Sequence, residues 1–161
     1  MDRNKLYSKR YFLIAAAIPV IAGIVIGTRA IVIAVKRSMD IAQIERRYPE
    51  AVITPSGLRY VITEEGTGPR PIAGRPVWVN YTGTLLNGQV FDSTDFLDRA
   101  LEFTVGVGNA IPGFDEAVMG MREGERRIVI IPPELAYGGR TLKNVPGHSF
   151  LIFDMELFRL R

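Results

Sequence analysis

Val79-Asn80-Tyr81-Thr82-Gly83 opens a series of five short segments that decide the fold of this chain. The others follow in order as Phe91-Asp92-Ser93, Ala110-Ile111-Pro112-Gly113-Phe114, Leu135-Ala136-Tyr137-Gly138 and Leu151-Ile152-Phe153-Asp154. Their large side chains are mostly aromatic, whereas acids, bases and metal ligands are few. The series therefore predicts a ring-lined apolar pocket rather than a site built around a nucleophile or a metal ion.

Alternation of apolar and polar residues predicts β-strands around these segments. It is clear in 58–63 and in 77–82, and Asn87-Gly88 is typical of a hairpin turn with positive φ at both positions. Further strands are expected at 101–105, 127–131 and 150–160. In the last of these, alternate residues should share one face, namely Leu151, Phe153, Met155 and Leu157.

One helix should interrupt the strands, beginning at Pro112. Proline suits the first helical position because no backbone N–H is needed there. Asp115 and Glu116 in the first turn suit the helix dipole, and Gly120 suits the C-terminal cap. A twisted antiparallel sheet of five to six strands packed on one short helix gives the α+β class.

The net charge of +3 comes from the N-terminus. Residues 1–37 hold seven Lys or Arg and one acid, whereas the rest of the chain holds 13 basic and 16 acidic residues. The folded part therefore lacks the basic excess that nucleic-acid binding needs. Cysteine is absent, and the single histidine, His148, cannot by itself build a His-rich metal site or a serine-type triad. We expect no metal ion and no cofactor.

An uncharged run from Tyr11 to Thr28 follows a basic leader, residues 1–10. Its 18 residues would form a helix of about 27 Å, close to the ~30 Å of bilayer hydrocarbon. We therefore expect a transmembrane signal anchor over residues 11–35, with a cleaved signal peptide and a buried soluble helix as alternatives. Gly23 and Gly27 have a spacing that lets two membrane helices pack closely, which would allow a weak dimer.

Lys and Arg flank both ends of the run, so the distribution of positive charge favours neither orientation in the membrane. A short basic leader before an apolar run is the export pattern, and it favours an extracytoplasmic C-terminal domain, periplasmic in a bacterium. A cytoplasmic-facing domain is the other possibility. Residues 36–56 are expected to be a linker with a short amphipathic helix that carries Ile41 and Ile44.

In order and spacing, the five segments resemble the FKBP-type peptidyl-prolyl cis-trans isomerases over residues 57–161. The resemblance implies a sheet half-wrapped around the helix and an enzyme that acts on proline-containing polypeptides and binds rapamycin-type macrolides. By position, it assigns catalysis to Tyr81, Asp92, Ile111, Tyr137 and Phe153. It assigns substrate binding to Phe91, Leu101, Phe103, Ala110, Phe114 and Val145.

Such a site would rotate an amide bond without breaking it. Rotation about the peptide C–N bond costs about 18–20 kcal/mol because resonance is lost. The twisted amide has a less polar carbonyl than the planar one, so a dry aromatic cavity should penalise the planar ground state more than the transition state. The resemblance implies that the Ile111 N–H binds a substrate carbonyl and that Asp92 and Tyr137 form a polar pair at the rim.

The chain departs from the family's common pattern at three places. Phe114 stands where many relatives have Trp, and Leu101 stands where Phe is common. The loop over residues 139–148 lacks the usual glycine-rich run and adds two cations, Arg140 and Lys143. This altered loop motivates an alternative, an FKBP-like binding or chaperone module with little turnover.

Overall fold

The computed structural model describes residues 27–97 and 99–160, and contacts within the chain divide it into two compact units between Met39 and Asp40. In the first unit, the described residues are helical and expose their large apolar side chains, which include Ile31, Val32, Ile33, Val35 and Met39. The expected leader, residues 11–26 of the expected anchor and Gly23 lie outside the described residues. Within the described part of the chain, no helix has the length and apolar character needed to cross a bilayer.

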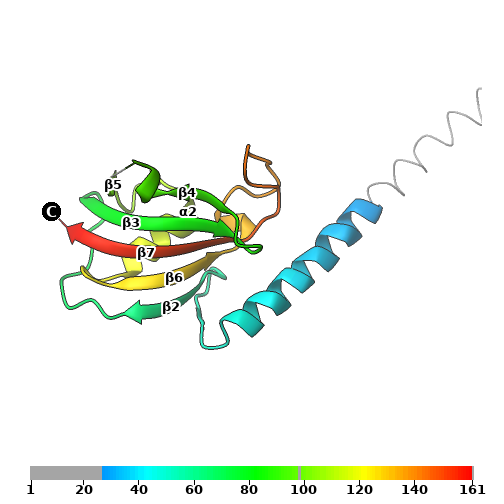
Figure 1. The fold of residues 1–161 in the computed structure, drawn as a ribbon, viewed down its shortest axis with the longest axis horizontal. Coiled ribbons are helices and arrows are strands. Elements are labelled where there is room, and N and C mark those ends of the chain that lie inside the picture. The colour runs from blue at the N-terminus through cyan, green and yellow to red at the C-terminus, as the bar shows by residue number, and fades with distance from the viewer. Residues whose placement is uncertain (1–26, 98, 161) are drawn as a thin grey trace, which may run out of the picture. The chain divides into compact units, whose positions relative to one another are not determined.

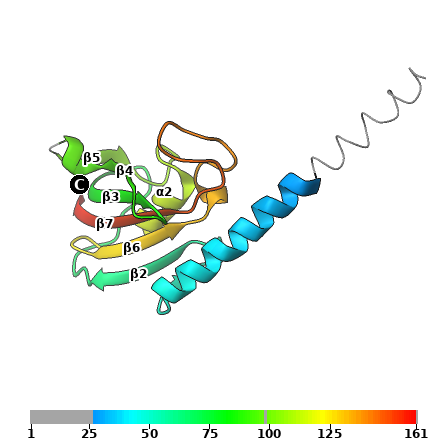
Figure 2. The same ribbon diagram turned by 45° about the vertical axis from the view of Figure 1, so that its right-hand side comes forward.

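The second unit is built on one antiparallel sheet that curves around a short helix, α2 (Figures 1 and 2). Its strand order is β1-β2-β6-β7-β3-β4, and β5 pairs with β3 beside that path. The helix is Pro112–Gly120. The strands are β1 Val52–Ile53, β2 Arg59–Glu64, β3 Pro76–Leu85, β4 Val90–Ser93, β5 Leu101–Thr104, β6 Arg126–Ile131 and β7 Leu151–Leu160. The expected α+β architecture is confirmed.

The expected number of strands, five to six, was wrong, because the described sheet has seven. The strand that the sequence pattern missed is β1, which pairs with β2 through Val52 and Ile53. A strand of two residues is too short to establish a periodic pattern. Two 3₁₀ turns, η1 Thr94–Leu97 and η2 Pro133–Leu135, follow β4 and β6, and the described residues 27–47 are helical.

The two long strands, β3 and β7, pair side by side from Val77–Leu160 to Leu85–Leu151. The predicted face of β7 is confirmed, because its four alternate residues are buried in the core cluster that also holds α2. The opposite face of the sheet is covered by residues 41–51, where Ile44 and Tyr48 pack against Ile130 and Ile152. Contacts therefore group Asp40 onward with the sheet, and the domain start at residue 57 stays a prediction.

The helix α2 is held in place at both ends. Pro112 occupies its first position as predicted, and the Asp115 carboxylate accepts hydrogen bonds from the backbone N–H groups of Gly106 and Gly108 at 2.6 and 3.1 Å. The C-terminal cap was predicted wrongly: Gly120 is the last helical residue and Met121 is the cap, with an extended backbone. The chain then turns at residues 122–125 before β6, where the Glu125 N–H donates to the Arg122 carbonyl and Gly124 has a φ of 81°.

The hairpin between β3 and β4 is confirmed, but its turn type was wrong. Gly88 has a φ of 86°, whereas Asn87 is not among the described residues with positive φ. The Gly88 N–H donates to the Leu85 carbonyl, and the Leu85 N–H donates to the Gln89 carbonyl. The Asn87 side-chain oxygen accepts from the Gln89 N–H. These bonds enclose a three-residue loop with one left-handed glycine, a turn that the sequence Asn-Gly serves equally well.

We expect Gly113→Ala to lower the free energy of unfolding by about 1–3 kcal/mol. A Cβ at Gly113 would collide with Ile131 Cγ2 and lie 3.1 Å from Leu135 Cβ, because α2 lies directly on β6 there. Gly120→Ala on the same helix is the matched control, since its nearest neighbour would be Arg127 Nη1 at 3.4 Å. Helix propensity should make the control neutral or up to about 1 kcal/mol stabilising. Urea unfolding of both variants measures the difference, and equal stability would contradict the close packing.

Candidate functional site

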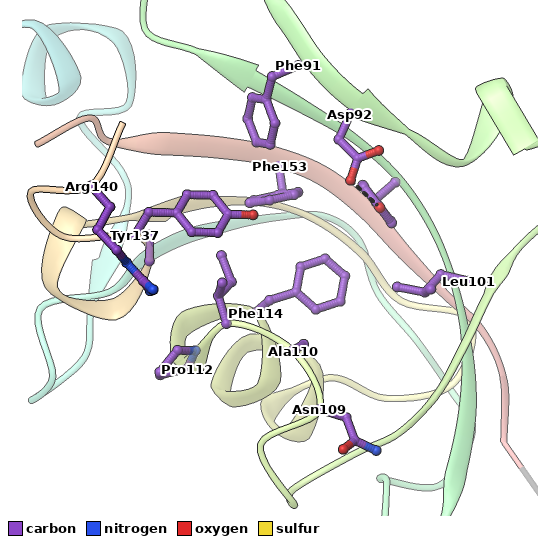
Figure 3. Close-up of a pocket in the computed structure, with 13 residues that line it drawn as sticks. Phe91, Asp92, Leu101, Asn109, Ala110, Pro112, Phe114, Tyr137, Arg140 and Phe153 are labelled. Atoms are coloured by element: carbon purple, nitrogen blue, oxygen red, sulfur yellow. Dashed lines mark hydrogen bonds between the residues drawn. The ribbon is translucent and has the colours of Figure 1, made fainter. Parts of the chain in front are cut away.

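A cavity of about 550 Å³ opens between the sheet and the N-terminal end of α2. Figure 3 shows its side chains converging from the strands, from α2 and from the loop after η2. We call it the ring-lined cavity. Its walls are formed by Tyr81, Phe91, Asp92, Leu101, Asn109, Ala110, Ile111, Pro112, Phe114, Ala136, Tyr137, Arg140 and Phe153.

Four aromatic rings form the inner wall and meet edge to face. Phe153 has its ring centroid 5.6 Å from Tyr81, 5.6 Å from Phe91 and 5.3 Å from Phe114. Tyr81 and Phe114 are 5.3 Å apart. Edge-to-face pairs at such distances stabilise one another beyond their burial, so each ring is fixed by its neighbours. The wall is therefore rigid as well as apolar.

A missing side chain lets the rings approach the sheet. Gly83 lies in β3, where an added Cβ would be 2.8 Å from Phe91 Cζ and 3.0 Å from Phe153 Cε1. Any larger residue at this position would push one of the two rings away. The Gly83 of the first quoted segment thus shapes the wall that the other segments build.

Polar groups gather at one side of the cavity. The Tyr81 hydroxyl donates a 2.7 Å hydrogen bond to Asp92 Oδ2, which is the dashed line in Figure 3. Burial, and then the hydrogen bond and charge of Asp92, raise the pKa of Tyr81 well above its usual range. Burial also raises the pKa of Tyr137, with a further contribution from the Asp92 charge. Both phenols therefore stay protonated donors at neutral pH.

The start of α2 contributes backbone rather than side-chain chemistry. The Ile111 carbonyl accepts hydrogen bonds from the N–H groups of Phe114 and Asp115 at 2.9 and 3.1 Å. Within the described residues, no hydrogen bond uses the Ile111 N–H. A donor without an internal partner, on the wall of an apolar cavity, is well placed to bind a carbonyl oxygen.

The loop over residues 138–148 borders the cavity on the side of Tyr137. It is folded on itself: Leu142 and Val145 form a two-way backbone bridge, and the His148 N–H donates to the Gly138 carbonyl at 2.7 Å. The Arg140 N–H donates to the Tyr137 carbonyl, which holds Arg140 beside that ring. The loop is thus an ordered wall and not an open flap.

Most of the predicted site residues come together in this cavity. Nine of the eleven line it, whereas Val145 and Phe103 do not. Val145 is buried in the main core, where it anchors the loop. Phe103 packs against Phe114, with 5.7 Å between the two ring centroids. Apolarity alone did not distinguish a core side chain from a wall side chain. The roles of the individual residues stay predictions.

Four further lining residues were not among the predicted site residues: Asn109, Pro112, Ala136 and Arg140. Three of them are sequence neighbours of predicted residues, so proximity to Ala110, Ile111 and Tyr137 was a usable signal. Arg140 lines the cavity through the turn that follows Tyr137, and the sequence had marked it only as an added charge.

Comparison with known proteins agrees with this geometry. The family model for the FKBP-type peptidyl-prolyl cis-trans isomerase matches residues 68–158.

FK506-binding protein 2 of Dictyostelium discoideum is 49% identical over 86 residues, which are 53% of this chain and 65% of that protein. Outer membrane protein MIP of Legionella longbeachae is 40% identical over 114 residues, 70% of this chain and 48% of that protein. The crystal structure of AtFKBP13 is 36% identical with a TM-score of 0.66, over 70% of this chain and 99% of that one. The chain thus spans less than two thirds of the length of these two sequence relatives.

The raised tyrosine pKa values predict alkaline destabilisation. Above pH 10, the ordinary tyrosine pKa, the unfolded chain releases phenolic protons that the folded domain retains, so stability falls as pH rises. Tyr81→Phe should make this decline shallower by at most about 1.4 kcal/mol per pH unit. Urea unfolding below and above pH 10 measures the slope, and Trp78→Phe serves as a control without a titrating phenol. An unchanged slope in Tyr81→Phe would contradict the buried phenol.

Proposed function

We infer the function of the whole protein from one premise, that this chain belongs to the FKBP-type peptidyl-prolyl cis-trans isomerase family. Its matched domain has the activity of that family, acceleration of rotation about X-Pro bonds. We propose that the whole protein applies this activity to unfolded or folding polypeptides. The observation that supports the proposal most directly is the cavity of about 550 Å³ with four mutually fixed rings.

The reaction needs no nucleophile or acid–base group, because no covalent bond is made or broken. A planar X-Pro amide has a large carbonyl dipole, which water stabilises and an aromatic wall does not. The twisted amide has lost resonance and part of that dipole, so it loses less on entering the cavity. The cavity therefore lowers the barrier by raising the planar state relative to the twisted one. Every 1.36 kcal/mol of such discrimination gives about a tenfold acceleration.

The polar groups would hold the substrate in register. We assign the Ile111 N–H to a substrate carbonyl, because it has no partner among the described residues. The Tyr137 hydroxyl borders the same space, and its raised pKa keeps it a protonated donor to higher pH than an ordinary phenol. Asp92, fixed by Tyr81, would orient the other end of the prolyl segment. Together these groups favour a twisted pose over a freely tumbling one.

We also propose that the N-terminal run anchors the protein in a membrane, with the isomerase domain on the extracytoplasmic side. The uncharged stretch from Tyr11 to Thr28 supports this, as does the exposed apolar surface of the described helix at Ile31, Val32 and Val35. The Legionella relative is named an outer membrane protein, which is compatible with a role outside the cytoplasm. Clients would then be polypeptides that fold close to the membrane.

The full chain should accelerate cis-trans exchange in a short X-Pro peptide. Asp92→Ala and Tyr137→Phe should each lower kcat/KM roughly two- to tenfold, because each removes a hydrogen-bonding group worth about 0.5–1.5 kcal/mol. Phe153→Ala should lower both activity and stability, the latter by about 3–5 kcal/mol. A protease-coupled or NMR exchange assay measures the rates, with urea unfolding alongside.

Tyr60→Phe is the matched control for Tyr137→Phe, because Tyr60 lies on β2 beneath the Arg127 guanidinium and does not line the cavity. It should leave the rate unchanged. A rapamycin-type macrolide should compete with the peptide, since an apolar cavity with a few polar groups suits a drug-sized ligand. Normal rates in both Asp92→Ala and Tyr137→Phe would remove the site assignment.

Alkaline phosphatase fused after Arg161 should be active in bacterial cells, because this enzyme folds only outside the cytoplasm. A reporter that is active only in the cytoplasm should be silent at the same position. Replacing Ile14, Ile18 and Ile21 with Asp should release the fusion from the membrane fraction, because charged residues at the centre of a span are costly. The opposite reporter pattern would reverse the proposed orientation.

A further inference from the structure

A second cavity, of about 680 Å³, adjoins the ring-lined cavity. All four residues of β5, Leu101–Thr104, line it, together with Trp78 of the neighbouring strand β3 and Asn109 of the loop before α2. We call it the β5 groove. Two predicted substrate-binding residues, Leu101 and Phe103, belong to it, whereas none of the predicted catalytic residues does.

The two cavities are continuous through shared residues. Leu101 and Asn109 line both of them. Figure 3 shows these two residues on one side of the ring-lined cavity and Arg140 on the opposite side. A polypeptide whose proline lies among the rings and whose chain leaves past Leu101 therefore enters the β5 groove. A proline inside a protein always has such flanking chain, whereas a small ligand does not.

The backbone of β5 offers a surface for that flanking chain. In the described sheet, β5 pairs only with β3, from Val79–Leu101 to Pro76–Thr104. Among the described residues, no other backbone hydrogen bond reaches Leu101–Thr104. One edge of the strand thus keeps its N–H and C=O groups for a partner, and an open strand edge is a template for an added extended chain.

The side chains of the groove are mixed, with apolar groups on Trp78, Leu101 and Phe103 and polar groups on Arg99, Glu102 and Asn109. Trp78 is half-buried, and its strand partners are Glu102 on one side and Arg159 on the other. The Arg159 guanidinium lies 5.7 Å from the centroid of the indole ring. The indole ring, held between these cross-strand neighbours, gives an incoming apolar side chain a fixed surface to cover. Leu101 pairs with Val79 and lies on the other face of the sheet, so successive side chains of an added strand would contact the Trp78 face and the Leu101 face in turn.

We propose that the β5 groove binds the extended polypeptide that flanks the substrate proline, added as a further strand along the free edge of β5. The proposal rests on the proposed isomerase function and extends it to substrate length. The four residues of β5 correspond to about 13 Å of extended chain, so about four flanking residues fill the groove. A bare tetrapeptide would occupy the ring-lined cavity alone.

Trp78 is the only tryptophan of the chain, so its fluorescence reports on the groove. The experiment compares three tryptophan-free peptides with one X-Pro bond: a tetrapeptide, and the same peptide with about four apolar residues added before or after it. One extended peptide should bind the full-length protein about tenfold more tightly, corresponding to 1.4 kcal/mol, and change the Trp78 emission. The tetrapeptide should leave the emission unchanged. Trp78→Phe should abolish the signal and reduce the gain in affinity seen by calorimetry, without removing it, because the backbone edge of β5 is unchanged.

Backbone methylation of the favoured peptide tests the strand geometry without altering the protein. An N-methyl group should raise Kd roughly two- to tenfold at every second residue of the extension and less at the residues between, because only alternate N–H groups face the edge of β5. Equal affinity for all three peptides, or no alternation, would overturn the proposal. Self-association of the peptide-free protein without any length effect would assign the edge to a second copy instead. Turnover of the tetrapeptide, measured in parallel, tests the isomerase function independently.

Discussion

The cavity depends on the edge-to-face contacts that the Phe153 ring makes with three other aromatic rings. The Phe153 ring projects from β7, the strand that pairs with both β3 and β6. Protein interiors normally close over such space, because unfilled volume forfeits dispersion contacts. Here each ring is stiff and is fixed by the others, so the wall cannot collapse into the opening. An apolar hollow then persists beside a well-packed core.

The position of α2 is also set by close packing. Gly113 lets the helix lie against Ile131, and the Asp115 carboxylate ties its first turn to the loop at Gly106 and Gly108. These contacts place the Ile111 N–H on the cavity wall with little freedom to move. A donor that is fixed before the substrate arrives loses less entropy on binding than one that must be ordered. The position of this backbone donor is therefore set by packing, and its role towards a substrate carbonyl stays a prediction.

The two faces of the sheet have different neighbours. One face carries α2 and the ring-lined cavity, while the other is covered by the segment that contains Ile44 and Tyr48. Covering the second face keeps apolar residues such as Ile130 and Ile152 from water. The edge at β5 has no such cover in the described structure, and it borders the cavity. In the proposal, substrate length and substrate chemistry are recognised by adjacent but different parts of the fold.

The sequence by itself determined the long strands, the helix and most of the wall, but not the two-residue strand β1. Alternation located the long strands and Pro112 located the helix, while the resemblance carried by the five segments identified nine of the residues that line the cavity. These features are local, since side-chain period and proline geometry depend on neighbouring residues alone. Tertiary structure alone decided that Val145 packs in the core, that Arg140 reaches the cavity and that β5 has a free edge. Those outcomes depend on which distant segments meet, and a buried side chain and a wall side chain have the same apolar character until the fold places one beside open space.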